Sequence, residues 1–198
     1  MIRGGNAGLM RTLIVLAALT VSAPGSDPAQ ARVTAFGDYQ FGMSREEVGR
    51  VPTCTPYTPV AGTHGLECPN LTVGSRKMNV SFAFTGDALS RIQLWFYEGP
   101  SESAARQATA EMLAFVSKRG RIRSNELKGA EPTPDAIFKS LRERNTDAQG
   151  ARVQVLLPPT TTPPFVHASV THVVTGYYVF VFFTDRREGR PIELRNGF

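Results

Sequence analysis

Regular alternation of apolar and polar residues predicts a β-hairpin near the middle of the chain. The apolar positions are Met78, Val80, Phe82 and Phe84 in one run and Ile92, Leu94 and Phe96 in the next. A period of two places these side chains on one face of each strand. The residues between the runs, Thr85-Gly-Asp-Ala88, have the composition of a turn.

A second hairpin is predicted near the C-terminal end. Its strands are residues 165–174 and 177–184, and its turn is Thr175-Gly176. Residues 177–183 are apolar on both faces, which is typical of a central strand or of an interface. Further strands are predicted at 33–41, 121–127 and 151–157. Residues 136–142 fit either a helix or a strand, and the turn-like residues 145–150 favour a strand that pairs with 151–157.

Two helices are predicted between these strands. Ser44 and Glu47 have the spacing of a capping box, and the helix that they begin ends before Pro52. Residues 101–119 carry apolar side chains at helical spacing, namely Ala105, Ala108, Met112, Phe115 and Val116. Together these elements predict an α+β fold for residues 32–198, an antiparallel sheet of hairpins with one long helix and one short helix packed on it.

The first 31 residues predict a signal peptide. Arg3 and Arg11 precede the apolar run 13–21, and Ala29-Gln-Ala31 matches the pattern that signal peptidase cleaves. An uncleaved anchor is disfavoured because a membrane span needs about 20 apolar residues, and this run is interrupted from Pro24. We therefore predict an exported chain, periplasmic or extracellular, that does not span a membrane after cleavage.

Export changes the interpretation of the two cysteines. Cys54 and Cys68 are the whole complement, and an even pair in an exported chain predicts a disulfide. Redox catalysis is disfavoured, because thirteen residues separate the two cysteines and catalytic pairs favour the C-x-x-C spacing.

Charge excludes one class of partner. The 22 Lys and Arg residues exceed the 17 Asp and Glu residues only slightly, giving a net charge of +5, so no nucleic-acid partner is predicted. The basic residues gather locally at Lys118, Arg119, Arg121, Arg123 and Lys128. We interpret that cluster as a complement to a helix C-terminus and as a solubilising surface.

Catalytic chemistry is weakly represented in the sequence. His167 and His172 fall on opposite faces of one predicted strand, so they cannot chelate one metal as a regular pair. No G-x-S-x-G, H-E-x-x-H or Gly-rich phosphate loop occurs. We predict no catalytic residue, metal site or cofactor. The alternative is a small secreted hydrolase with a site near His64, Glu67 or His167.

A binding surface is predicted on the strand that carries Ile92. Its opposite face holds the candidate binding residues, which are Arg91, Gln93, Trp95 and Tyr97. Aromatic rings beside polar groups are favoured at interface hot spots. If this face is free, Trp95→Ala leaves the melting midpoint nearly unchanged and abolishes partner binding. The alternative is that another element buries Trp95.

Two motifs resemble those of small exported α/β domains. The first is Phe41-Gly-Met-Ser-Arg-Glu-Glu-Val48, and the second is the spacing of Phe84, Asp87, Leu89 and Ile92. Over residues 36–97 they resemble the SmpA-type outer-membrane assembly lipoproteins and the β-lactamase-inhibitor-like proteins. This resemblance implies a sheet with helices packed on it and a non-catalytic binding role, with a protein or envelope component as the partner.

Overall fold

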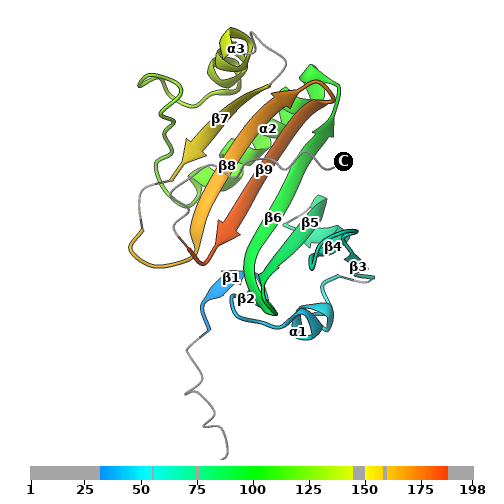
Figure 1. Ribbon diagram of the computed structural model, residues 1–198. Coiled ribbons are helices and arrows are strands. Elements are labelled where there is room, and N and C mark those ends of the chain that lie inside the picture. The colour runs from blue at the N-terminus through cyan, green and yellow to red at the C-terminus, as the bar shows by residue number, and fades with distance from the viewer. Residues whose placement is uncertain (1–31, 55, 75, 145–149, 158–159, 187–198) are drawn as a thin grey trace, which may run out of the picture. The chain divides into compact units, whose positions relative to one another are not determined.

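A seven-stranded antiparallel sheet dominates the structure, a computed structural model that describes residues 32–54, 56–74, 76–144, 150–157 and 160–186 (Figure 1). Along the sheet the order is β3 (Thr58–Pro59), β4 (Leu66–Val73), β5 (Arg76–Thr85), β6 (Ala88–Gly99), β9 (Gly176–Thr184), β8 (Phe165–Val173) and β7 (Ala151–Leu156). A two-stranded sheet holds β1 (Thr34–Phe36) and β2 (Tyr39–Gln40). The predicted signal peptide lies outside the described residues.

The predicted fold class is wrong. The described residues form three small helices, α1 (Arg45–Gly49), α2 (Glu102–Ser117) and α3 (Pro134–Arg144), beside a much larger share of strand. The protein is mostly antiparallel sheet, and it is not an α+β fold in which one long and one short helix cover a sheet of hairpins. Two differences contribute most: α3 forms where a strand was expected, and β4 adds an unpredicted strand.

The residues of α3 were expected to favour a strand paired with 151–157. Ile137, Phe138 and Leu141 are buried instead on one side of a helix, because their spacing matches its period. At the start of α3, the Thr133 hydroxyl accepts a hydrogen bond from the Ala136 N–H at 3.2 Å. Helical spacing and this cap outweigh the turn-like sequence that follows.

Both predicted hairpins are confirmed. β5 and β6 are joined by a turn in which Gly86 has a φ of +61°, a conformation that glycine adopts without strain. β9 lies between β6 and β8, as expected for a central strand. In contrast, residues 33–41 fold into the β1–β2 hairpin, and within 121–127 only Arg123 forms a bridge, to Leu156.

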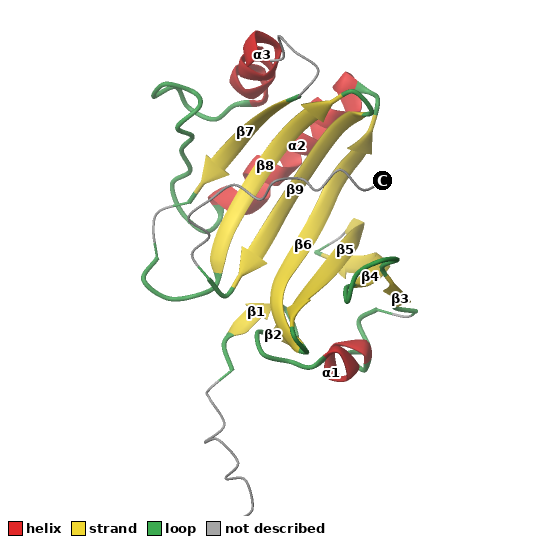
Figure 2. Ribbon diagram, in the orientation of Figure 1, coloured by secondary structure: helices red, strands yellow, loops and turns green. Residues whose placement is uncertain are grey.

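The hydrophobic core lies between the seven-stranded sheet and α2, which runs along one face of β6 and β9 (Figure 2). From α2 the core receives Ala105, Ala108, Met112, Leu113 and Val116. The strands contribute alternate residues, including Val80, Phe82, Ile92, Leu94, Val179 and Val181. We call the opposite face of this sheet the outer face.

The predicted capping box of α1 is confirmed. Ser44 Oγ accepts from the Glu47 N–H at 3.2 Å, and Glu47 Oε2 accepts from the Ser44 N–H at 2.7 Å. A hydrogen bond from Arg32 is the main cause that lowers the pKa of Glu47 to about 2. The helix ends at Gly49, before Pro52 as expected.

A disulfide links Cys54 to Cys68, as predicted. Their Cα atoms lie 5.9 Å apart, and the bond ties the segment after α1 to β4. Among the described residues, no helix combines the length and apolar character needed to cross a membrane.

Candidate functional site

Three of the four predicted binding residues lie together on the outer face. Strand pairing places Arg91, Gln93 and Trp95 of β6 opposite Thr184, Phe182 and Phe180 of β9. Directly opposite residues in an antiparallel pair project from the same face, and all three β6 side chains are half-buried. The alternation that predicted this face is therefore correct as far as Trp95.

Aromatic rings surround Trp95 on the outer face. Its ring centroid lies 5.4 Å from that of Phe180 and 6.4 Å from that of Tyr178. The indole Nε1–H donates to Ser81 Oγ at 2.9 Å, so the polar edge of the ring has a partner on β5. Phe180 is buried, with 7% of its surface exposed. Trp95 is therefore neither a free surface residue nor a core residue.

Tyr97 does not join the other three residues. A β-bulge between Trp95 and Tyr97 shifts the register, so that Tyr97 pairs with the core residue Val179. Tyr97 accordingly packs against the core, and its hydroxyl accepts from the Ser101 N–H at 2.9 Å. Simple alternation missed this reversal because a bulge adds one residue to the strand.

A groove lies between β5 and β6, next to this bulge. Pairing between these strands ends at Asn79 and Trp95, although β5 begins at Arg76 and β6 continues to Gly99. Beyond that point β5 pairs only with β4, and β6 pairs only with β9. The groove encloses about 360 Å³ and is lined by Arg76, Lys77, Met78, Asn79, Trp95, Phe96, Tyr97 and Glu98.

The groove presents unused polar groups. The side chains of Lys77, Asn79 and Glu98 are exposed, and none forms a hydrogen bond or ion pair with the described residues. Arg76 is engaged, because it forms an ion pair with Glu111 of α2. Lys77, Asn79 and Glu98 are not apparent as site residues from the sequence, because the groove depends on where the β5–β6 pairing stops.

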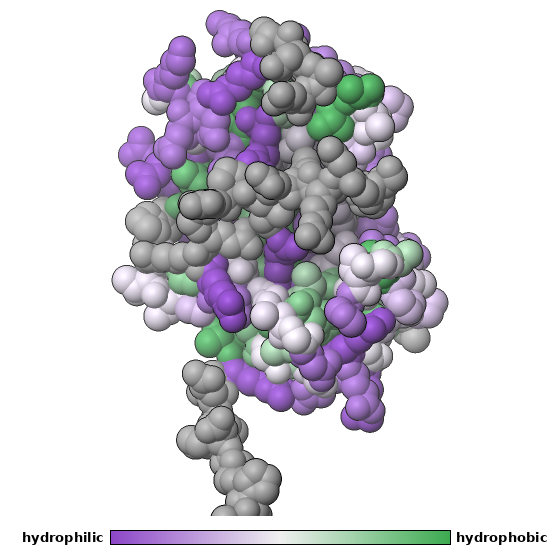
Figure 3. Space-filling model, viewed as in Figure 1, coloured by the Kyte–Doolittle hydropathy of each residue, from purple (hydrophilic) through white to green (hydrophobic). Residues whose placement is uncertain are grey.

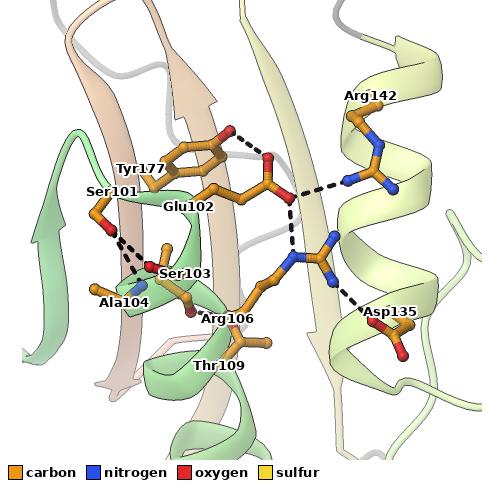
Figure 4. Close-up of polar contacts among 10 residues, drawn as sticks. Ser101, Glu102, Ser103, Ala104, Arg106, Thr109, Asp135, Arg142 and Tyr177 are labelled. Atoms are coloured by element: carbon orange, nitrogen blue, oxygen red, sulfur yellow. Dashed lines mark hydrogen bonds and ion pairs between the residues drawn. The ribbon is translucent and has the colours of Figure 1, made fainter.

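A second polar cluster joins α2 to α3 and β9 (Figure 4). Glu102 accepts from Arg106 Nε at 2.8 Å, from Arg142 at 3.0 Å and from the Tyr177 hydroxyl at 3.1 Å. The hydrogen bond from Arg106 is the main cause that lowers the pKa of Glu102, and burial raises the pKa of Tyr177. Arg106 also pairs with Asp135. Because both carboxylate oxygens of Glu102 are occupied, we interpret this cluster as a link between helices.

Of the residues of the alternative hydrolase site, Glu67 of β4 and His167 of β8 are not brought together, because β5, β6 and β9 lie between their strands in the sheet. His64 and Glu67 are exposed, and no hydrogen bond or ion pair links either of them to His167. The ring of His167 stacks on Phe182 on the outer face, with centroids 4.8 Å apart. His172 stacks on Tyr177 at 4.2 Å, on the opposite face of β8. In the described part of the chain, no group of three or more His, Cys, Asp and Glu residues is arranged to hold a metal ion.

The chain matches no family model, and neither a curated protein nor a solved structure is significantly similar to it. The resemblance to SmpA-type and inhibitor-like domains therefore stays a prediction.

Proposed function

We propose that this protein is an exported, non-catalytic binding module that holds an extended peptide segment of a protein or envelope component in the groove between β5 and β6. The observation that carries this proposal is the separation of the two strands beyond Asn79 and Trp95. Each strand keeps its partner on the far side, so the backbone edges that face the groove remain open.

An extended peptide suits these edges. A strand added to an open edge gains main-chain hydrogen bonds, and pockets for alternate side chains give specificity. Trp95 and Phe96 provide aromatic surface, and Lys77, Asn79 and Glu98 provide a cation, an amide and a carboxylate for polar side chains. The volume of about 360 Å³ accommodates a few side chains of a ligand whose ends lie outside the groove.

The proposed export rests on sequence and is consistent with the disulfide. Residues 1–31 have the charge, apolar run and cleavage pattern of a signal peptide. A structural disulfide persists in an oxidising compartment such as the periplasm or the extracellular space.

The test is selection of ligands from a display library of random peptides about ten residues long, a length that covers the groove in an extended conformation. Selected peptides should bind the purified protein and change the fluorescence of Trp95, which is the sole tryptophan. Methylating alternate backbone nitrogens of a selected peptide should weaken binding by at least about tenfold, because it removes main-chain donors.

Variants localise the binding. Trp95→Phe and Lys77→Ala should each weaken binding by roughly tenfold, whereas the control Lys139→Ala on α3 should not. Trp95→Phe is preferred to Trp95→Ala, because half-burial and the Ser81 hydrogen bond predict that the alanine variant loses about 1–3 kcal/mol of stability. Failure to select any peptide, or equal binding by the methylated peptides, would show that the proposal is wrong.

A further inference from the structure

Five exposed cations without an ion-pair partner among the described residues lie in the loop between α2 and α3. Lys118, Arg119, Arg121, Arg123 and Lys128 all have exposed side chains, and none forms an ion pair with a described residue. Arg119 lies over the rings of Phe115 and Phe183, and the other four side chains extend from the loop without a described partner. We call residues 118–128, which carry these five cations, the basic loop.

Six of the twelve other Lys and Arg residues in the described structure form ion pairs. Ion pairs join the following residues to glutamates: Arg32, Arg50, Arg76, Arg106, Lys139 and Arg142. The basic loop contains one acidic residue, Glu126, whose carboxylate accepts a hydrogen bond from Ser124. Lys118 is the C-cap of α2 and Arg119 follows it, so the expected role as complement to a helix C-terminus fits these two residues. Arg121, Arg123 and Lys128 lie beyond that helix end.

The backbone of the basic loop is fixed, which keeps its cations directed outward. Ser124 and Leu127 are buried, and Arg123 exchanges two backbone hydrogen bonds with Leu156, at 3.0 and 2.7 Å. Exposed Arg121 and Arg123 alternate with the inward-facing Ile122 and Ser124. In Figure 3 hydrophilic residues gather over α3 and the loop that precedes it, at the upper left of the view.

We infer that the basic loop docks the protein on a membrane surface rich in anionic phospholipid headgroups. This inference rests on the proposed export only for the location of the membrane. Such a surface carries many negatively charged headgroups, and each exposed Lys or Arg side chain close to it adds to the electrostatic attraction. Residues 118–128 include no aromatic side chain on which the bases of a single-stranded nucleic acid could stack, so lipid headgroups fit the loop better than a single strand does.

The experiment measures co-sedimentation of the purified protein with vesicles that contain phosphatidylglycerol and phosphatidylcholine, or phosphatidylcholine alone. The protein should bind only the anionic vesicles and should be released at about 1 M salt, where the screening length is about 3 Å. Arg121→Gln/Arg123→Gln should weaken binding about thirtyfold. The matched control Arg45→Gln/Arg50→Gln, which removes the same charge from α1 and its C-cap, should change vesicle binding by less than about threefold.

Three results would overturn the inference. They are equal binding to neutral vesicles, an equal loss in both double variants, and a duplex DNA of about 20 base pairs bound more tightly than the anionic vesicles at the same salt concentration. Peptide selection provides the separate measurement: the Arg121→Gln/Arg123→Gln protein should still bind groove peptides. A variant that loses only vesicle binding therefore reports on the basic loop. A variant that loses only peptide binding reports on the groove.

Discussion

His167 shows how one side chain makes the stability of the sheet depend on pH. The imidazole stacks on Phe182, and burial lowers the pKa of His167 below its ordinary value of 6.5. The unfolded chain therefore takes up a proton at a higher pH than the folded chain does. The stability that His167 contributes is present above about pH 6.5 and is lost as the pH falls through the lowered pKa of the folded state.

Replacing His167 should remove this dependence. We expect the free energy of unfolding of His167→Phe to vary less between about pH 7 and pH 5 than that of the wild type. Urea denaturation at several pH values measures the difference. His64→Phe serves as the control, because His64 is an exposed loop residue. Parallel curves for the wild type and His167→Phe would mean that His167 titrates alike in both states.

The alternation of residues along β6 predicted part of the site but not all of it. Alternation correctly placed Arg91, Gln93 and Trp95 on one face, because it needs only a regular strand. It failed at Tyr97, since a bulge reverses the faces and depends on packing against β9.

Individual elements were predictable where local chemistry decides them. The capping box determines the start of α1, and the turn at Gly86 joins β5 to β6. β4 escaped prediction because its residues Leu66, Cys68 and Leu71 are buried across a register shift that breaks their alternation. Its pairing with β5 depends on residues distant from β4 along the chain.

The position of α3 depends on a network whose strength should vary with pH. Glu102 of α2 binds Arg142 of α3 and Arg106, and Arg106 reaches Asp135 at the start of α3. A hydrogen bond from Arg106 lowers the pKa of Glu102 in the folded protein. The stability that ionised Glu102 contributes is therefore present above the pKa of a glutamate in the unfolded chain, near 4.3. It is lost as the pH falls through the lowered pKa of the folded state.

We expect Glu102→Gln to lower the free energy of unfolding by about 1 kcal/mol at pH 7, a small value because the side chains are partly exposed to solvent. The difference from the wild type should shrink as the pH falls below about 4. Chemical denaturation at both pH values measures it, with Glu143→Gln as an exposed control on α3. A difference that stays constant with pH would assign the loss to packing.

At the scale of the whole molecule, the sequence predicted paired strands but not the gap between two of them. The central place of β9 followed from its apolar residues on both faces. No sequence pattern predicts the groove. It lies where β5 stays paired with β4 and β6 stays paired with β9, so that β5 and β6 are no longer paired with each other. The basic loop was visible as a run of cations, but its lack of acidic partners emerged only from the tertiary structure.

The disulfide acts at this scale by closing the segment between α1 and β4. It joins Cys54 to Cys68 across a sequence separation of 14, and a loop of this length gains about 3 kcal/mol from the restricted unfolded state. We expect Cys54→Ala/Cys68→Ala to lower the free energy of unfolding by roughly that amount in urea denaturation. The bond lies on the side of β5 away from β6, so groove peptides should bind the folded double variant as they bind the wild type.

Alkylation of native protein from the exported fraction should label neither cysteine until a reductant is added. Labelling of both thiols without reductant would show that the disulfide is absent from the native protein.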